Sequence, residues 1–178
     1  MRRSVTVSKQ FVFVGAAIVS LALALVSALR FPNIAVRATT HGPQIKGHAL
    51  KIHLQDTNGE WHDLSSLHGR YVLIVFFCGC IPCQQINHRF VLIKQRRPEI
   101  SVLGITAMSS ADVKSYEAYH HINFPILTDP YFRTSRQWNS TECPKCWIID
   151  PGETIAYGSS HGDSASSILA VVNEYFPS

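Results

Sequence analysis

Residues 71–83 read Tyr-Val-Leu-Ile-Val-Phe-Phe-Cys-Gly-Cys-Ile-Pro-Cys, and this stretch decides the fold. Its first seven residues are continuously apolar and partly β-branched, which is typical of a strand buried on both faces of a sheet. From Cys83 to Gln95 apolar residues recur among polar ones as in a helix, which Pro98 brings to an end. The stretch therefore predicts a buried strand followed by a helix, with the C-x-x-C pair Cys80 and Cys83 at the junction.

Short strands and helices alternate on both sides of this junction. Upstream, a hairpin is expected from two strands, 49–54 and 60–63, joined by a turn at 57–59. Downstream, we expect strands at 100–106, 124–127, 146–150 and 154–157, and helices at 109–119, 131–138 and 163–175, the last with Asp163 as its N-cap. Strands that alternate with helices and end in a hairpin indicate an α/β domain built on one sheet.

The first 30 residues form a membrane-targeting segment. The run from Phe11 to Leu29 is apolar and uncharged, and Arg30 closes it. As a helix it would rise about 28 Å, close to the ~30 Å hydrocarbon thickness and longer than the apolar core of about 7–15 residues in a cleaved signal peptide. We therefore expect residues 1–30 to be a cytoplasmic tip and a transmembrane anchor. Cleavage near Ala28 is the alternative, and it would give a secreted protein.

Positive charge sets the expected orientation of this anchor. Arg2, Arg3 and Lys9 precede the apolar run and are expected to stay on the cytoplasmic side. The rest of the chain then lies on the extracytoplasmic side, which is periplasmic or at the cell surface. Residues 31–47 carry prolines and glycines without a hydrophobic period and predict a linker, so that residues 48–178 form the folded domain.

The composition argues against a nucleic-acid partner and draws attention to the cysteines. The chain has 178 residues and a formal net charge of +4, with its basic residues scattered among acidic ones. A nucleic-acid binder would carry a concentrated basic stripe, so we expect no nucleic-acid partner. Five cysteines in an exported domain would meet oxidising conditions, and an odd number leaves at least one of them unpaired.

The C-x-x-C pair indicates thiol–disulfide chemistry. The free backbone N–H groups and the dipole at a helix N-terminus stabilise a nearby thiolate, so Cys80 is the expected nucleophile. Cys83, one helical turn further, would attack the mixed disulfide that Cys80 forms and release the partner. Pro82 suits the first helical turn, where no N–H is needed. The only cofactor required would be the redox-active disulfide itself.

Two further interpretations of the cysteines remain open. A fixed disulfide is one, although a bridge across two residues constrains little chain entropy. A metal site is the second, because Cys78, Cys80, Cys83, Cys143 and Cys146 offer five soft ligands for copper(I) or zinc. His88 is the first histidine to consider as a helper. We do not favour a metal, because thiols in an export compartment tend to oxidise.

Several segments of the chain resemble one known group of proteins. They are residues 56–67, 72–83, 102–105, 124–130 and 143–152, in this order. The pattern resembles the redoxin group of the thioredoxin-like superfamily. That group includes the alkyl-hydroperoxide-reductase/thiol-specific-antioxidant proteins and the membrane-anchored thiol–disulfide oxidoreductases of cytochrome c maturation, which are closest in pattern.

The resemblance implies a thioredoxin fold and further residues of the site. Pro144 would be the cis-proline that faces the active-site cysteines, which places Cys143 beside Cys80. Pro82, Cys143 and Pro144 would then form the wall of the site. Relatives commonly have Thr or Val before this proline, so a thiol there is a departure. The auxiliary candidates are Cys78, Cys146 and Glu142, the last as a substitute for the buried acid that many thioredoxins carry and this chain replaces with Ile74.

Together these observations favour an extracytoplasmic thiol–disulfide oxidoreductase. Its partners would be the disulfides and thiols of exported proteins, with a membrane electron donor to recharge it. The competing functions are a peroxiredoxin-like thiol peroxidase with antioxidant activity and a cysteine-based copper or zinc carrier. Similar peroxiredoxins usually place Thr or Ser three residues before the reactive cysteine, where this chain has Phe77 before Cys80. This difference disfavours the peroxidase.

Overall fold

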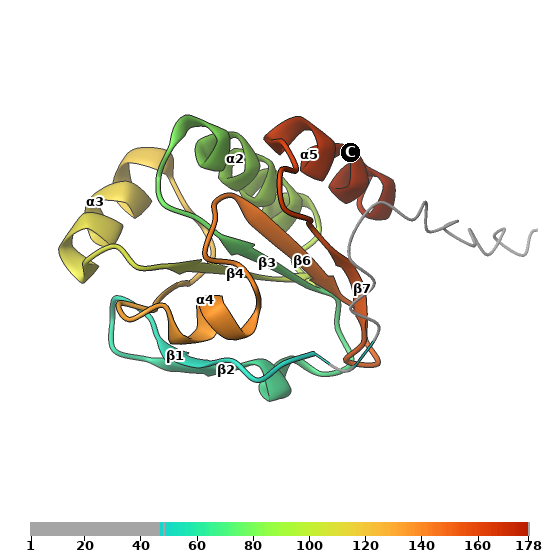
Figure 1. The fold of residues 1–178 in the computed structure, drawn as a ribbon, viewed down its shortest axis with the longest axis horizontal. Coiled ribbons are helices and arrows are strands. Elements are labelled where there is room, and N and C mark those ends of the chain that lie inside the picture. Colours follow the sequence, from blue (N-terminus) through green and yellow to red (C-terminus); the bar gives the residue numbers. More distant parts are fainter. Residues whose placement is uncertain (1–46, 48, 178) are drawn as a thin grey trace, which may run out of the picture. The chain divides into compact units, whose positions relative to one another are not determined.

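A five-stranded mixed sheet forms the centre of the domain in a computed structural model, which describes residues 47 and 49–177 (Figure 1). Its strands are β3 (Val72–Phe76), β4 (Ser101–Thr106), β5 (Ile126–Thr128), β6 (Lys145–Ile149) and β7 (Ile155–Gly158), in the order β5-β4-β3-β6-β7. The first three strands are parallel to one another, whereas β6 and β7 run antiparallel to their neighbours. The α/β sheet predicted from the sequence is confirmed.

Strand β3 lies at the middle of the sheet and has both faces covered. All five of its residues are buried, as a continuous apolar run requires. Because side chains alternate along a strand, Leu73 and Val75 enter the core on one face, while Ile74 and Phe76 enter the core on the other. Two hydrophobic cores therefore hold the end of β3, and with it the start of the cysteine segment, in place.

Helices cover the two faces of the sheet unequally (Figure 1). The face of Leu73 and Val75 is covered by α2 (Ile81–Arg96), α3 (Ser110–His120) and α5 (Ala165–Tyr175). The opposite face is covered by the short helix α4 (Arg133–Gln137), the 3-10 turn η1 (Leu64–Leu67) and a separate two-stranded sheet of β1 (His53–Gln55) and β2 (Trp61–Asp63). The larger helices therefore stabilise the face from which α2 carries the C-x-x-C pair.

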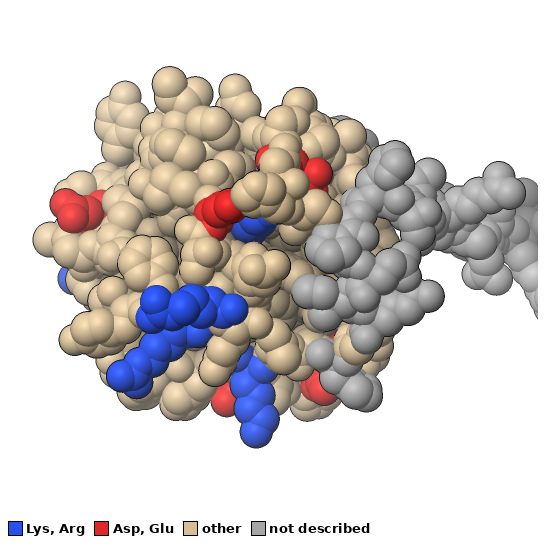
Figure 2. Space-filling model, viewed as in Figure 1, with Lys and Arg blue, Asp and Glu red and all other residues tan. Residues whose placement is uncertain are grey.

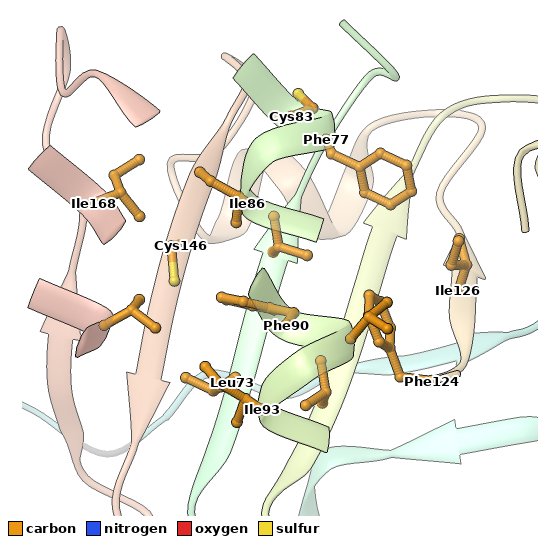
Figure 3. Packing of buried hydrophobic residues seen from close by; sticks show 14 of the residues in the cluster. Leu73, Phe77, Cys83, Ile86, Phe90, Ile93, Phe124, Ile126, Cys146 and Ile168 are labelled. Atoms are coloured by element: carbon orange, nitrogen blue, oxygen red, sulfur yellow. The ribbon is translucent and has the colours of Figure 1, made fainter. Parts of the chain in front are cut away.

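Helix α2 packs on the sheet through one stripe of apolar residues. Ile86, Phe90 and Ile93 recur at intervals of three and four positions and are almost fully buried. Figure 3 shows them facing the sheet near Leu73, with Cys146 lying between this helix and the helix that carries Ile168. This packing fixes the axis of α2 and thus the position of its N-terminus.

A close contact beneath the sheet explains a glycine near the end of β7. A Cβ atom at Gly158 would overlap the ring of Trp147, its neighbour across the β6–β7 pair. Trp147 in turn packs edge-on against Trp138, with ring centroids 5.4 Å apart, and both are buried. Only glycine fits this position, because the indole occupies the space of any side chain.

Charged side chains form no continuous stripe on the face drawn in Figure 2. Lys and Arg are most numerous near α4, which carries Arg133 and Arg136, and acidic groups stand elsewhere on the same face. This distribution agrees with the scattered charge of the sequence.

Several element boundaries differ from the predictions by one to four residues. The first strand is shorter than predicted, because only His53–Gln55 pairs with β2. The final helix has Ser164 as its N-cap, since the carboxylate of Asp163 accepts a hydrogen bond from the backbone N–H of Ser160 instead. The predicted anchor at 1–30 and the linker before Gly47 lie outside the described residues. Of the helices in the described residues, none has the length and apolar character that a membrane crossing requires.

Candidate redox site

The cysteine segment begins where β3 leaves the sheet. The backbone N–H of Phe77 still donates to the carbonyl of Ile105, and the chain then turns at Gly79, whose φ of 84° suits glycine. Cys80 follows as the N-cap of α2, with Pro82 in the first turn. The helix begins at Ile81, two residues before the predicted start, so Cys80 and Cys83 both lie at its N-terminus.

Cys80 and Cys83 form a close pair with unequal access to solvent. Their Sγ atoms are 3.1 Å apart. Cys80 is half-buried, whereas Cys83 is completely buried. Burial raises the pKa of the Cys83 thiol to about 12, and the neighbouring Cys80 adds to the rise. Cys83 is therefore a neutral thiol at neutral pH, and Cys80 is the member of the pair that solvent reaches.

Cys78 and Cys143 are joined by a disulfide, with their Cα atoms 6.2 Å apart. The register of the sheet explains why they meet. In the antiparallel β3–β6 pair Phe76 lies opposite Lys145, so two steps further along β3 and back along β6 bring Cys78 opposite Cys143. The Cys143–Pro144 peptide bond is cis, as the resemblance to redoxins implies.

The two cysteine pairs together form one group, which we call the sulfur cluster: Cys78, Cys80, Cys83 and Cys143. All four Sγ atoms lie within 4.8 Å of one another. Cys78 and Cys83, which belong to different pairs, have their Sγ atoms 4.0 Å apart. Thiols and disulfides exchange by direct attack of one sulfur on another, so this spacing makes the four residues one chemical site.

The remaining two auxiliary candidates lie apart from the cluster. Cys146 follows Cys143 by three residues, but its side chain is fully buried in the core, and this burial raises the pKa of its thiol. The carboxylate of Glu142 is 2.7 Å from Nδ1 of His161 and 3.8 Å from Nζ of Lys145. Lys145 is buried and also donates to the carbonyl of Ser160. In the described residues, the polar contacts of Glu142 are thus with His161 and Lys145 and not with the cysteines.

One wall of the site comes from residues that the sequence did not single out as a set. Sδ of Met108 and Cε2 of Tyr116 are each 3.7 Å from the position of a Cβ at Gly79. The hydroxyl of Tyr116 accepts a hydrogen bond of 3.0 Å from the amide of Asn87, which is buried one turn after Cys83 in α2. The spacing could have revealed this role, because Asn87 lies four residues after Cys83 and three before Phe90 and so falls on the buried side of α2; only its polar side chain disguised it.

A hollow of about 260 Å³ lies beside the Cys78–Cys143 bond. Met108, Phe132 and Phe77 line it together with both cysteines of the bond. Its walls come from loops that follow β3 and β4 and precede β6. The hollow presents apolar side chains next to the sulfur atoms of this bond.

The same four sulfurs are the ligand set that a soft metal would find in this domain. Four thiolates suit zinc or copper(I). Among the described residues, no histidine atom joins this set, and His88 is exposed on α2. The Cys78–Cys143 disulfide would have to be reduced before all four could bind an ion.

Solved structures with this fold include several thiol-based redox proteins. A thiol:disulfide interchange protein from Chlorobium tepidum is 19% identical, with a TM-score of 0.60 over 72% of this chain and 94% of that one. Peroxidoxin BcpB from Mycobacterium tuberculosis is 15% identical, with a TM-score of 0.62 over 74% and 94% of the two chains. A secreted M. tuberculosis disulfide oxidoreductase described as homologous to E. coli DsbE is 16% identical, with a TM-score of 0.61 over 70% and 94%.

At these identities the structural likeness shows the fold alone, which is thioredoxin-like. A comparison with curated protein sequences finds no match. The sequence model of the AhpC/TSA family, however, matches residues 45–158. That range covers well over half of the chain and contains every member of the sulfur cluster. The helix-start cysteine pair, the cis-proline beside it and this match together place the chain in a known group of thioredoxin-fold redox proteins: it belongs to the AhpC/TSA family.

Proposed function

We propose that this protein is a thiol–disulfide oxidoreductase that exchanges a Cys80–Cys83 disulfide with the thiols of other proteins. The observation that carries the proposal is the pair itself. Two sulfurs 3.1 Å apart lie at the start of α2, one accessible and one buried. An accessible sulfur can attack a partner, and a buried one can resolve the product without competing for the first attack.

The reaction needs only the two cysteines. The Cys80 thiolate attacks one sulfur of a client disulfide, and the second client sulfur leaves as a thiolate that takes up a proton. Cys83 then gives up its proton and attacks Sγ of Cys80, so that the bond between Cys80 and the client breaks. The client leaves with two thiols, and the enzyme keeps the disulfide. The high pKa keeps Cys83 a neutral thiol until the mixed disulfide makes Sγ of Cys80, only 3.1 Å away, a target for attack.

We further propose that residues 1–30 anchor the domain in a membrane and that the domain works on the extracytoplasmic side. The apolar run between Arg30 and the cationic N-terminus supports this location. A membrane electron donor would then reduce the Cys80–Cys83 disulfide after each cycle. A thiol reagent that cannot cross membranes would test the location, since it must label Cys80 in intact cells if the domain faces outward.

A cysteine-based metal carrier is the second candidate, and the spacing of the sulfur cluster is the observation that favours it. Four Sγ atoms within 4.8 Å need little movement to surround a copper(I) or zinc ion. The candidate requires both cysteine pairs to be reduced at the same time. A peroxidase is the third candidate, and within the AhpC/TSA family it differs by using peroxide, rather than a protein disulfide, as the oxidant of Cys80.

A redox titration of the full-length chain in metal-free buffer separates these candidates. The chain is equilibrated with buffers of set thiol–disulfide ratio, alkylated, digested and mapped by mass. If Cys80 and Cys83 interconvert as a pair, the oxidoreductase holds, and the midpoint shows whether it reduces or oxidises its clients. If both remain alkylatable under oxidant, the proposal fails. Protection by a stoichiometric metal would establish the carrier, and reaction with peroxide but not with a peptide disulfide would establish the peroxidase.

A further inference from the structure

The sulfur cluster holds two cysteine pairs in different oxidation states. Cys80 and Cys83 are free thiols, whereas Cys78 and Cys143 share a disulfide. The pairs meet at Cys78 and Cys83, whose Sγ atoms are 4.0 Å apart. An isolated structural bridge has no free thiol beside it, but this one lies within 4.8 Å of two.

We propose that Cys78 and Cys143 are a second redox couple, which re-reduces the Cys80–Cys83 disulfide through a transient bond between Cys78 and Cys83. The proposal rests on the proposed function, because it needs Cys80 and Cys83 to be oxidised by a client. The second couple would double the number of electrons that the protein can store. A fully reduced molecule holds four electrons instead of two, and it reduces two client disulfides before a donor has to recharge it.

The transfer balances without any additional reagent. The Cys78 thiolate attacks Sγ of Cys83, the Cys80–Cys83 bond breaks, and Cys80 leaves as a thiolate. The Cys143 thiolate then attacks Sγ of Cys78, the Cys78–Cys83 bond breaks, and Cys83 leaves. Two electrons pass from one pair to the other. The two protons lost by Cys78 and Cys143 equal the two that Cys80 and Cys83 take up.

The surroundings of the sulfurs favour this direction. Cys78 is exposed to solvent and can lose its proton there, as an attacking sulfur must. Cys80, the first leaving group, lies at the N-terminus of α2, where backbone N–H groups stabilise a thiolate. Cys83, the second leaving group, is buried and takes up a proton as it leaves, so this second step is expected to be the slower one.

The register of the sheet gives the second couple its fixed geometry. Cys78 lies two residues after the end of β3, and Cys143 lies two residues before the start of β6, so both lie just beyond the final Phe76–Lys145 pair. The last pair of the sheet therefore sets the positions of both residues, while the first turn of α2 sets that of Cys83. The transfer needs only sulfur movements of about an ångström or two, because a disulfide bond is about 2 Å long and the attacking atom starts at 4.0 Å.

Counting electrons in a single turnover tests the proposal. The full-length chain, purified in detergent, is fully reduced, freed of reductant without air and mixed with an excess of a peptide closed by one disulfide. Samples are quenched in acid, alkylated and mapped by mass. We expect the unmodified chain to open two peptide disulfides, and the double variant Cys78→Ser, Cys143→Ser to open one. Cys146→Ala is the matched control, since it removes a cysteine outside the cluster, and it should still open two.

The order of oxidation separates a relay from two independent pairs. In Cys80→Ser, the peptide can react only by direct attack of the exposed Cys78, which lies outside the N-terminus of α2 that favours a thiolate at Cys80, so formation of the Cys78–Cys143 bond should slow at least tenfold. If this bond forms as fast as in the unmodified chain, or if it never opens while Cys80 and Cys83 cycle, the relay is wrong and the proposed function stands. If Cys80 and Cys83 do not react with the peptide even in the double variant, the proposed function itself fails.

A trapped intermediate tests the route. The double variant Cys80→Ser, Cys143→Ser leaves Cys78 and Cys83 as the only thiols of the cluster. Mild oxidation with diamide should join them, and mass mapping would identify the bond. If Cys83 stays alkylatable under these conditions, the transfer does not pass through a Cys78–Cys83 bond and the proposed route is wrong.

Discussion

Cys143 and Cys146 lie three residues apart in the chain, but their surroundings differ completely. Cys143 lies in the loop before β6 and shares a disulfide with Cys78, whereas Cys146 lies within β6 and is fully buried between the sheet and its helices (Figure 3). The comparison shows that exposure to solvent and to other sulfur atoms decides the chemistry of a cysteine in this domain. A sulfur just beyond the end of a strand meets other sulfurs and solvent, whereas a sulfur three residues further, inside β6, lies in the apolar core.

The largest expected effect is a loss of turnover, and only replacement of a cysteine in the sulfur cluster should cause it. Cys80→Ser removes the accessible nucleophile, so we expect reduction of a peptide disulfide to slow by at least about a thousandfold. Cys146→Ala should stay within about a factor of two, because Cys146 contacts only the core. The assay is reduction of the peptide with a regenerating dithiol. An equal loss in both variants would show that the core thiol takes part.

The next effect is on stability. Replacing both Cys78 and Cys143 with Ser removes a bond between residues that are 65 positions apart in the sequence. Because this frees the unfolded chain, the free energy of unfolding should fall by about 4 kcal/mol. The core change Cys146→Ser buries a hydroxyl instead, at a cost of about 1–3 kcal/mol. Denaturant titration of the oxidised proteins gives both values. A double variant as stable as the unmodified chain would mean that the bond constrains little of the unfolded ensemble.

A third expectation concerns alkaline pH. Burial raises the pKa of Cys83 from 9.0 to about 12 and also raises that of Cys146. Above about pH 9 the unfolded chain loses these protons, while the folded chain keeps them, so the free energy of unfolding of the reduced protein should fall as the pH rises towards 12. Denaturant titrations at pH 8 to 11 measure the slope. The slope should be smaller in Cys146→Ala, and an unchanged slope would remove Cys146 as a contributor.

The smallest effect is expected at Glu142. Its contacts with His161 and Lys145 are partly exposed, so Glu142→Gln should cost less than about 1 kcal/mol of stability. Its carboxylate has no polar contact with the described cysteines, so the rate of peptide reduction should change by less than about threefold. A larger loss of rate, with unchanged stability, would instead show that the carboxylate moves to Cys83 during the reaction.

Much of the fold follows from local patterns. The apolar run before Cys78 predicts the central strand, and the observed β3 lies within the predicted residues. Ser109 caps α3 as its side chain and position suggest. The ends of helices and strands are less predictable where contacts with other segments of the chain determine them. β1 is short because β2 offers only three partners, and Ser164 replaces Asp163 as a cap because Asp163 has a partner of its own.

The site could be predicted only in part, because half of it depends on register. The pair Cys80 and Cys83 follows from spacing alone. Their place beside Cys143 came from a resemblance and not from the residues. The bond between Cys78 and Cys143 joins segments 65 residues apart, and it depends on Phe76 lying opposite Lys145. A shift of that register would point the alternate side chains to the other face, and no pattern within either strand fixes the pairing.

Trp138 and Trp147 give the protein an internal optical probe. Two indoles locked edge-on with centroids 5.4 Å apart couple electronically, so the folded domain should have a strong near-ultraviolet circular dichroism band. Trp61 is 60% exposed and contributes emission that a soluble quencher removes first. Because the ring of Trp138 lies 6.2 Å from that of Phe76, two residues before Cys78, the signal of the buried pair reports the packing at the end of β3 that holds the sulfurs in place.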